Sequence, residues 1–250
     1  MINEIILGDC LVEMQNIPDK SVDMILCDLP YGTTACKWDT IIPFEPLWQQ
    51  YKRIIKDNGA IVLTASQPFT TDLISSNRKY FRYCLVWDKK RSANPMLAKV
   101  QPLKVHEDIV VFYKSMPSYN PQMGSGEFRN KKSYYKGSTS DAFQYTNKQE
   151  DNFNNQYYPK SILDISNANQ SGKIHPTQKP VALFEYLIKT YTNEGETVLD
   201  NCAGSGTTAI ACLNTNRNYI CIEKEPKYYE IAQNRINEHI KNQKNLFNHA

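Results

Sequence analysis

The chain has 250 residues, of which 41% are hydrophobic and 22% charged, and its formal net charge is +3. This suffices for one sizeable α/β core, as one domain with an insertion or as two domains, and the mild charge permits a polyanionic partner without requiring one. Seven scattered cysteines without a CxxC pair indicate neither a disulfide framework nor a metal site. The sequence shows no basic leader and no apolar run near the ~20 residues of a membrane span. We therefore expect a cytoplasmic protein outside the membrane.

Short runs rich in Val, Ile and Leu alternate along the chain with helical patterns. The predicted strands are 4–7, 22–27, 60–64, 83–87, 109–113, 197–200 and 219–222, and the predicted helices are 46–55, 181–191, 207–213 and 228–239. Such alternation is typical of an α/β fold with a mostly parallel, twisted sheet and helices on both faces. Because 109–113 follows 83–87 through a helix-poor stretch, we expect this one strand to be antiparallel.

The segment DLPYG, Asp28 to Gly32, directly follows the predicted strand VDMILC. The exocyclic amine of a nucleobase is a poor nucleophile, so an enzyme that modifies it must accept hydrogen bonds from its N–H groups. Asp28 supplies one acceptor, and the carbonyl of Leu29, constrained by Pro30, supplies a second. Tyr31 can stack on an extracted base. Each residue alone has a simpler explanation, since Asp and Pro often end strands and Tyr is common at surfaces.

A basic run lies between Arg78 and Lys104, with eight basic residues and one acid. Clustered positive charge is typical of a surface that faces phosphates, and a solvated basic loop is the simpler alternative. The candidate DNA-binding residues in this run are Lys89, Lys90, Arg91, Lys99 and Lys104.

The segment from Lys114 to Ile174 differs from the rest in composition. It contains 13 Asn or Gln, nine Ser and six Tyr, but only four Ile or Leu and no Val, so it cannot build much core of its own. Polar and aromatic side chains of this kind can read base edges. We therefore predict a recognition insertion at 114–174, between a catalytic part at 1–113 and a cofactor-binding part at 175–250 of the same domain.

A glycine-rich loop follows the predicted strand 197–200. Gly204 to Ala209 fits the loose G-x-G-x-x-G/A pattern of nucleotide-binding loops, and Glu223 at the end of the next strand can accept hydrogen bonds from ribose hydroxyls. A plain Gly-rich turn is the alternative. Asp200, four residues before the first glycine, would repel a dinucleotide pyrophosphate and attract the ammonium of S-adenosylmethionine, so the loop favours that cofactor over NAD.

These motifs carry a resemblance to a known family. DLPYG resembles the [DNS]-P-P-[YF] motif of DNA amino-methyltransferases, and VLDNCAGSGTT resembles their glycine-rich S-adenosylmethionine motif. KIHPTQKP, Lys173 to Pro180, resembles the segment that precedes that motif in the permuted β-class and closes over the cofactor. The motif order is also that of the β-class. The resemblance covers nearly all of the chain except Ser115 to Gly172, and it implies a Rossmann-like methyltransferase fold with double-stranded DNA as the partner.

The resemblance also implies roles for individual residues. The catalytic and base-binding residues are Asp28, Leu29, Pro30 and Tyr31. The cofactor-binding residues are Asp9, Cys10, His175, Thr177, Lys179, Asp200, Ala203, Gly204, Ser205, Gly206, Thr207 and Glu223. Whether the chain forms a homodimer, and whether it works with a restriction endonuclease, stays open.

The target atom follows from what the sequence lacks. Cytosine-C5 enzymes need a cysteine nucleophile in a Pro-Cys pair, and no proline here precedes a cysteine. Direct transfer to an amine is therefore preferred, and Asp at position 28 resembles adenine-N6 enzymes more than cytosine-N4 enzymes. The sequence leaves open a cytosine-N4 enzyme, an RNA or protein amide N-methyltransferase, an NAD-dependent oxidoreductase and a non-catalytic DNA-binding module.

Overall fold

The computed structural model describes residues 2–33, 36, 39–90, 92, 95–131, 152–167 and 178–248. The described chain forms two compact units, one of Met1–Asn120 with Ser161–Ala250 and one of Pro121–Lys160. The sequence predictions for Arg91, His175 and Thr177 lie outside the described residues.

The larger unit is built on an eight-stranded sheet of order β1-β10-β9-β2-β3-β5-β4-β8. Its strands are β1 (Glu4–Leu7), β2 (Val22–Asp28), β3 (Ile55–Ala65), β4 (Phe81–Asp88), β5 (His106–Phe112), β8 (Ile162–Asp164), β9 (Thr197–Asp200) and β10 (Asn218–Glu223). Only β5 runs antiparallel to its neighbours β3 and β4, and the other pairs in this sheet are parallel. The predicted mostly parallel sheet with one antiparallel strand is confirmed.

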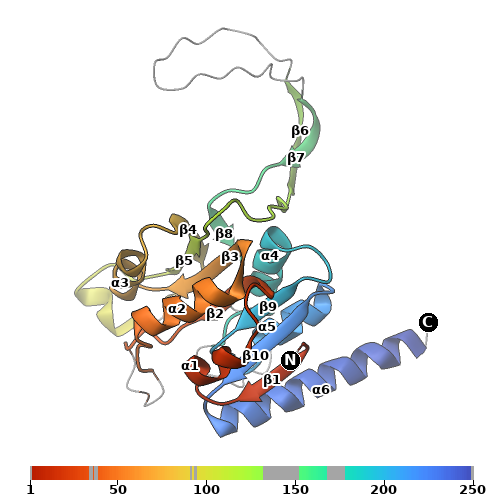
Figure 1. Cartoon of the computed structure of the whole chain (residues 1–250). Helices are drawn as coiled ribbons and strands as arrows, with labels where there is room; N and C mark the ends of the chain where they lie inside the picture. Colours follow the sequence, from red (N-terminus) through yellow and green to blue (C-terminus); the bar gives the residue numbers. More distant parts are fainter. Residues whose placement is uncertain are drawn as a thin grey trace. The chain divides into compact units, whose positions relative to one another are not determined.

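Helices cover both faces of this sheet, which gives three layers (Figure 1). The helices are α1 (Cys10–Glu13), α2 (Phe44–Ile54), α3 (Phe69–Ser76), α4 (Val181–Tyr191), α5 (Thr207–Asn214) and α6 (Pro226–Asn248), with 3₁₀ turns η1 (Met14–Asn16) and η2 (Pro95–Lys99). One buried apolar cluster joins the sheet to α1, α2 and α3, and a second joins it to α4, α5 and α6.

The central strand β2 shows why both faces are covered. Ile25 and Cys27 belong to the first cluster, whereas Met24 and Leu26 belong to the second, and all four side chains are fully buried. Since successive side chains of a strand point to opposite faces, a continuous apolar run such as MILC needs a helical layer on each side.

Three short elements of the larger unit were not predicted from the sequence. They are α1, α3 and β8. β8 adds a three-residue edge strand to β4 and lies inside the segment predicted as an insertion. α1 and β8, with four and three residues, have too few residues to show a period, and tertiary contacts decide their structure.

The smaller unit contains β6 (Gly124–Lys131) and β7 (Asn152–Tyr157), which pair antiparallel as a two-stranded sheet. It lies within the predicted recognition insertion. None of the described helices is both long and apolar enough to cross a membrane.

Candidate functional site

The DLPYG segment and the glycine-rich loop, the two motif loops, leave the sheet at the same edge. In the β1–β10 pair Leu7 lies opposite Glu223, and in the β2–β9 pair Ile25 lies opposite Leu199. Because β1, β10, β9 and β2 are parallel neighbours, their carboxyl ends form one row, where α/β sheets of this kind bind ligands. DLPYG continues from β2, and the glycine-rich loop continues from the adjacent β9.

The candidate catalytic turn, DLPYG, is held together by hydrogen bonds around Asp28. The Tyr31 hydroxyl donates to Asp28 Oδ1 at 2.8 Å and lies 3.0 Å from Thr64 Oγ1, and the Thr64 hydroxyl also donates to Asp28 Oδ1. Thr64 lies directly opposite Asp28 in the β2–β3 pair. Sequence reasoning did not select Thr64, although a polar residue at the end of the strand beside the motif was the available signal.

Asp39 closes the other end of this turn. Its two carboxylate oxygens accept hydrogen bonds from the amides of Gly32 at 2.9 Å and Thr33 at 3.0 Å. Gly32 has a φ of +67°, a left-handed conformation that a side chain would strain. Asp39 therefore fixes the backbone that presents Asp28 and Tyr31, and its distance in sequence from the motif hid this role.

The other residues of the motif are packed into the scaffold. The Tyr31 ring stacks on Phe69 with centroids 5.2 Å apart, so at most one of its faces can meet a base. Leu29 is 4% exposed, and Pro30 is half-buried. The burial of the Leu29 side chain leaves its backbone carbonyl as the group available for chemistry.

Lys179 contacts the Asp28 carboxylate, the candidate catalytic group. Its Nζ donates to Asp28 Oδ1 at 2.8 Å and Oδ2 at 2.7 Å and lies 3.2 Å from Glu107 Oε2. Burial opposes the ammonium, but the charges of Asp28 and Glu107 outweigh it and raise the pKa of Lys179. Burial likewise opposes the Glu107 carboxylate, but Lys179 and Lys89 lower the pKa of Glu107. The sequence placed Lys179 over the cofactor and did not select Glu107.

Gly204 and Gly206 of the glycine-rich loop have different surroundings. A Cβ added at Gly204 would meet no atom of the described residues within 4 Å, whereas one at Gly206 would lie 3.2 Å from the Ala232 Cβ on α6. Gly206, with a φ of +76°, thus allows close helix packing at the start of α5, and Gly204 faces open space where a ligand can approach. The Gly204 amide donates to Glu223 Oε2 at 2.7 Å.

Asp200 is buried at the root of the glycine-rich loop and is 2% exposed. It accepts hydrogen bonds from the Cys202 amide at 3.0 Å and from the Thr208 hydroxyl. Burial raises the pKa of Asp200 to about 6, against the effect of these hydrogen bonds. Both oxygens therefore have protein donors, and this carboxylate ties the loop to the first turn of α5.

Arg235 on α6 holds the middle of the loop. Its guanidinium donates to the Ser205 carbonyl at 2.9 Å, to the Ser205 hydroxyl at 3.2 Å and to the Thr207 hydroxyl at 3.2 Å. The Ala203 amide donates to the Ile222 carbonyl at 2.9 Å, which joins the start of the loop to β10. Sequence reasoning missed Arg235, since its loop partners lie about thirty residues away.

Asp9 and Cys10 lie after β1, next to the end of β10. The Gly8 amide donates to the Glu223 carbonyl at 2.9 Å, and Asp9 caps α1 by accepting from the Leu11 amide at 3.0 Å. A hydrogen bond from Lys224 lowers the pKa of Asp9, whereas burial raises the pKa of Glu223. The structure thus brings the predicted residues of β1, β9 and β10 to one edge.

Cys27 directly precedes the catalytic motif, but its thiol is not suited to nucleophilic attack. It is fully buried, and burial raises its pKa to about 12. A thiol with such a pKa is almost entirely protonated at neutral pH. This agrees with direct methyl transfer to an amine rather than covalent catalysis by cysteine.

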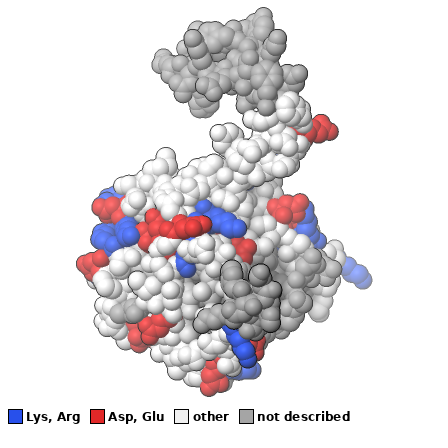
Figure 2. Space-filling view, turned by 90° about the vertical axis from the view of Figure 1, so that its right-hand side faces the viewer, with Lys and Arg blue, Asp and Glu red and all other residues white. Residues whose placement is uncertain are grey.

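The predicted DNA-binding lysines differ in their surroundings. Lys89 is 9% exposed, and its Nζ lies 2.9 Å from Glu107 Oε1. Lys90 pairs with Asp88 and Asp164, both at 3.0 Å. In Figure 2 basic and acidic side chains adjoin one another on the face shown. The run of positive charge in the sequence is therefore partly neutralised by acids from other segments.

Two lysines of the run keep polar heads at the surface. Lys99, at the end of η2, is exposed, and the half-buried Lys104 donates to the Ser66 hydroxyl at 2.6 Å. The hydrogen bond of Lys104 to a hydroxyl does not neutralise its charge. These two lysines are the better placed of the predicted set to meet phosphates.

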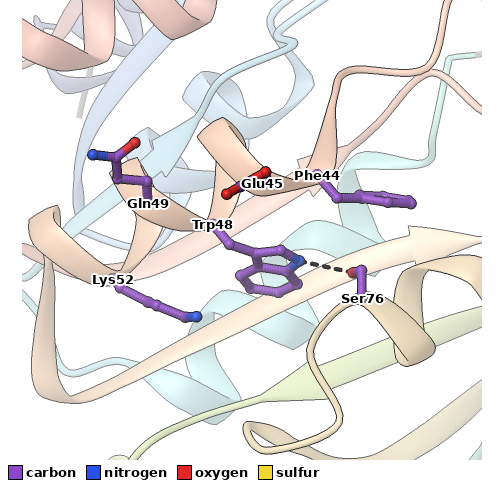
Figure 3. A pocket seen from close by; sticks show the side chains of 6 residues that line it. All are labelled: Phe44, Glu45, Trp48, Gln49, Lys52 and Ser76. Carbon is purple, nitrogen blue, oxygen red and sulfur yellow. Dashed lines mark hydrogen bonds between the residues drawn. The ribbon is translucent and has the colours of Figure 1, made fainter.

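A surface hollow of about 640 Å³ is lined by residues of α2 and by one residue of α3. Figure 3 shows its lining, in which the Trp48 indole donates to the Ser76 hydroxyl at 2.8 Å. The lining residues are Phe44, Glu45, Trp48, Gln49, Lys52 and Ser76. None of them belongs to the predicted site.

The sequence and the fold can be compared with known proteins. The profile of the family N6_N4_Mtase, described as DNA methylase, matches residues 22–234. The DNA adenine methyltransferase YhdJ of Escherichia coli (strain K12) is 29% identical over 93% of this chain and 82% of its own length. The type II methyltransferase M.HpaI of Haemophilus parainfluenzae is 26% identical over 94% of this chain and 74% of its own.

The fold resembles that of solved methyltransferase structures. The structure of an M1.HpyAVI–SAM complex superposes with a TM-score of 0.63 at 23% identity and covers 93% of this chain and 98% of that one. The fold is therefore Rossmann-like, with the candidate site at the carboxyl edge of its sheet. With the profile match over most of its length, this chain belongs to the DNA methylase family.

Tyr51 on α2 supports the glycine-rich loop, since its buried hydroxyl donates to Asn201 Oδ1 at 2.6 Å. We expect Tyr51→Phe to lower the free energy of unfolding by about 1–3 kcal/mol, because it leaves a buried acceptor without a donor. Urea denaturation measures this, with Tyr158→Phe at a site 72% exposed as the matched control. Equal losses in the two variants would contradict the role given to Tyr51.

The raised pKa of Asp200 makes stability depend on pH. The carboxyl titrates near 3.8 in the unfolded chain and near 6 in the folded protein, so the stabilisation from its proton is complete below about pH 4 and is lost as pH rises through 6. Relative to Asp200→Asn, we expect the parent's free energy of unfolding to fall by up to about 3 kcal/mol between about pH 4 and pH 7.5. Urea denaturation at both pH values measures these free energies of unfolding. An equal change with pH in the parent and in Asp200→Asn would refute the expectation.

Proposed function

We propose that this DNA methylase transfers a methyl group from S-adenosylmethionine to the exocyclic N6 amine of an adenine flipped out of duplex DNA. The observation that carries the proposal is the position of Asp28 and of the glycine-rich loop at the ends of the adjacent strands β2 and β9. A flipped base is needed because the amine is not accessible within the stacked duplex.

In this reaction the residues of the chain would act mainly as hydrogen-bond acceptors for the target amine. Asp28 and the Leu29 carbonyl would accept from the two N–H groups of the amine and favour a pyramidal nitrogen. S-adenosylmethionine, when bound, would supply a methyl group made electrophilic by its sulfonium. The amine nitrogen would form the new bond with its lone pair and lose one proton, for which the Asp28 carboxylate, as the acceptor of an N–H hydrogen bond, is the nearest proposed base.

The residues of the carboxyl edge fit this cofactor. No described residue comes within 4 Å of a Cβ placed at Gly204, so a ligand could approach its backbone closely. Glu223 and Asp9 lie at or just after the ends of adjacent strands, and their carboxylates would accept from hydroxyl or amine groups in addition to their present protein donors. The charge of Asp200 disfavours a pyrophosphate. This argues against an NAD-dependent oxidoreductase, which would also leave DLPY without a use. Calorimetric titration with NAD and with S-adenosylmethionine separates the two.

Adenine is favoured over cytosine by two observations. The YhdJ relative is named a DNA adenine methyltransferase, and position 28 is Asp. The family name covers N4 as well as N6 chemistry, so a cytosine-N4 enzyme is the second candidate. A base amine of RNA or a glutamine amide nitrogen of a protein would need the same acceptors. A methylation assay across DNA, RNA and protein separates these substrates.

The first prediction concerns Asp28. We expect Asp28→Ala to slow methyl transfer to DNA by about a hundredfold or more, because one of two acceptors for the target amine is lost. The dissociation constant of S-adenosylmethionine should change by less than about threefold. Tritium transfer to unmodified bacteriophage λ DNA and calorimetry measure the two effects, and Asp72→Ala, an exposed site on α3, is the control. Parental transfer rates in Asp28→Ala would refute the assignment.

The second prediction concerns the phosphate contacts that we propose for Lys99 and Lys104. The double variant Lys99→Gln/Lys104→Gln should reduce the slope of log affinity against log salt concentration by about two, since each phosphate contact contributes about 0.9. Lys89→Gln should leave the slope unchanged, because that ammonium is buried against Glu107. Fluorescence anisotropy of labelled duplex measures the slopes. A larger change of the salt slope in Lys89→Gln than in the double variant would contradict phosphate contacts by Lys99 and Lys104.

A further inference from the structure

Four charged side chains form a buried chain that begins at the catalytic carboxylate. Asp28 contacts Lys179, Lys179 contacts Glu107, and Glu107 contacts Lys89. The side chains are 22%, 8%, 15% and 11% exposed in that order. With two acids and two lysines in alternation, the chain is neutral, so each buried charge has a partner of opposite sign.

In this arrangement Asp28 has little capacity left for a substrate. Its Oδ1 accepts from Tyr31, Thr64 and Lys179, and its Oδ2 accepts from Lys179 at 2.7 Å. Since Oδ1 already has three donors, an amine that donates to Asp28 has to use Oδ2, where Lys179 is the donor already present. The function proposed above therefore places the target amine in competition with the Lys179 ammonium for this oxygen.

Lys179 cannot simply move into water, because its side chain is 8% exposed and an unpartnered buried ammonium is costly. Glu107 offers it another acceptor. Lys179 Nζ is already 3.2 Å from Glu107 Oε2, against 2.7 Å from Asp28 Oδ2. The contact with Glu107 is thus the longer of the two, and a small movement of the ammonium would shorten it.

Glu107 is itself held in place for this exchange. It lies on β5, and its other oxygen, Oε1, accepts a hydrogen bond from Lys89 at 2.9 Å. Lys89 thereby occupies one oxygen and leaves Oε2 directed to Lys179. A movement of the ammonium between two carboxylates also keeps the net charge of the buried chain at zero.

We propose that Glu107 is a positioning residue, which accepts the Lys179 ammonium and so frees an oxygen of Asp28 for the target amine. This rests on the proposed function, since it assumes that Asp28 accepts that amine. Without the Glu107 carboxylate, Lys179 stays on Asp28 and competes with the substrate. In a variant without that carboxylate, the Lys179 ammonium therefore lowers the rate of methyl transfer by occupying Asp28.

The test compares Glu107→Gln, Lys179→Gln and the double variant in the full chain. We expect Glu107→Gln to lower the single-turnover rate of methyl transfer to unmodified λ DNA about tenfold or more, with dissociation constants for DNA and S-adenosylmethionine within about twofold of the parent. Because removal of the ammonium removes the competitor, the double variant should be faster than Glu107→Gln alone. A purely structural role for Glu107 predicts a double variant that is slower still.

The control is Asp108→Asn, which removes one carboxylate from the next position of β5. Asp108 accepts from the Thr70 hydroxyl at 2.7 Å, and an Asn oxygen can accept the same bond. Its rate should stay within about twofold of the parent. A Glu107→Gln rate equal to that of Asp108→Asn, or a double variant no faster than Glu107→Gln, would overturn the proposal.

Two further results keep the outcomes distinct. If Glu107→Gln does not fold, Glu107→Asp retains the charge but withdraws the carboxylate by one methylene, and it should show the same loss of rate with melting near the parent's. A parental rate in that variant overturns the proposal. If the parent itself transfers no methyl group to DNA, or Asp28→Ala is as active as the parent, the proposed function fails, and not merely the role of Glu107.

Discussion

The parallel pairing of β2 with β9 is the constraint on which the site depends. Ile25 lies opposite Leu199, so the strand that ends at Asp28 and the strand that ends at Asp200 finish side by side. Their sequence separation is large, and nothing in either loop alone requires the other. The pairing is stabilised by the buried faces of both strands, which pack against helices on each side of the sheet. Packing of an apolar core thus sets the distance between a candidate cofactor loop and a candidate catalytic turn.

Charge is arranged differently at the two ends of this edge. Around the glycine-rich loop, buried carboxylates such as Asp200 accept backbone and hydroxyl donors and hold the loop in shape. Around the catalytic turn, Asp28 faces an ammonium, and the chain of ion pairs continues to Lys89. Buried ion pairs contribute little net stability, because desolvation offsets their attraction. Their retention beside Asp28 therefore fits a role in presenting that carboxylate.

Much of the fold, and the two motif loops, could be predicted from the sequence, because both depend on local patterns. The apolar runs of the strands, the DLPYG turn and the glycines all lie within short windows. The side chains that complete the site could not be predicted: Lys179 reaches Asp28 from 151 residues away, and Tyr51 reaches Asn201 from 150. Such contacts depend on strand register and helix placement. The partial neutralisation of the basic run could not be predicted either, since acids from other segments pair with two of its lysines.

The most direct test of the account is the identity of the methylated nucleoside. Unmodified λ DNA is incubated with the protein and S-adenosylmethionine, digested to nucleosides and analysed by mass spectrometry. A site in which Asp28 and a peptide carbonyl hold an exocyclic amine predicts a product methylated on that amine, which is N6-methyladenine for the proposed adenine target and N4-methylcytosine for the second candidate. The appearance of 5-methylcytosine, or of no methylated nucleoside at all, would contradict it.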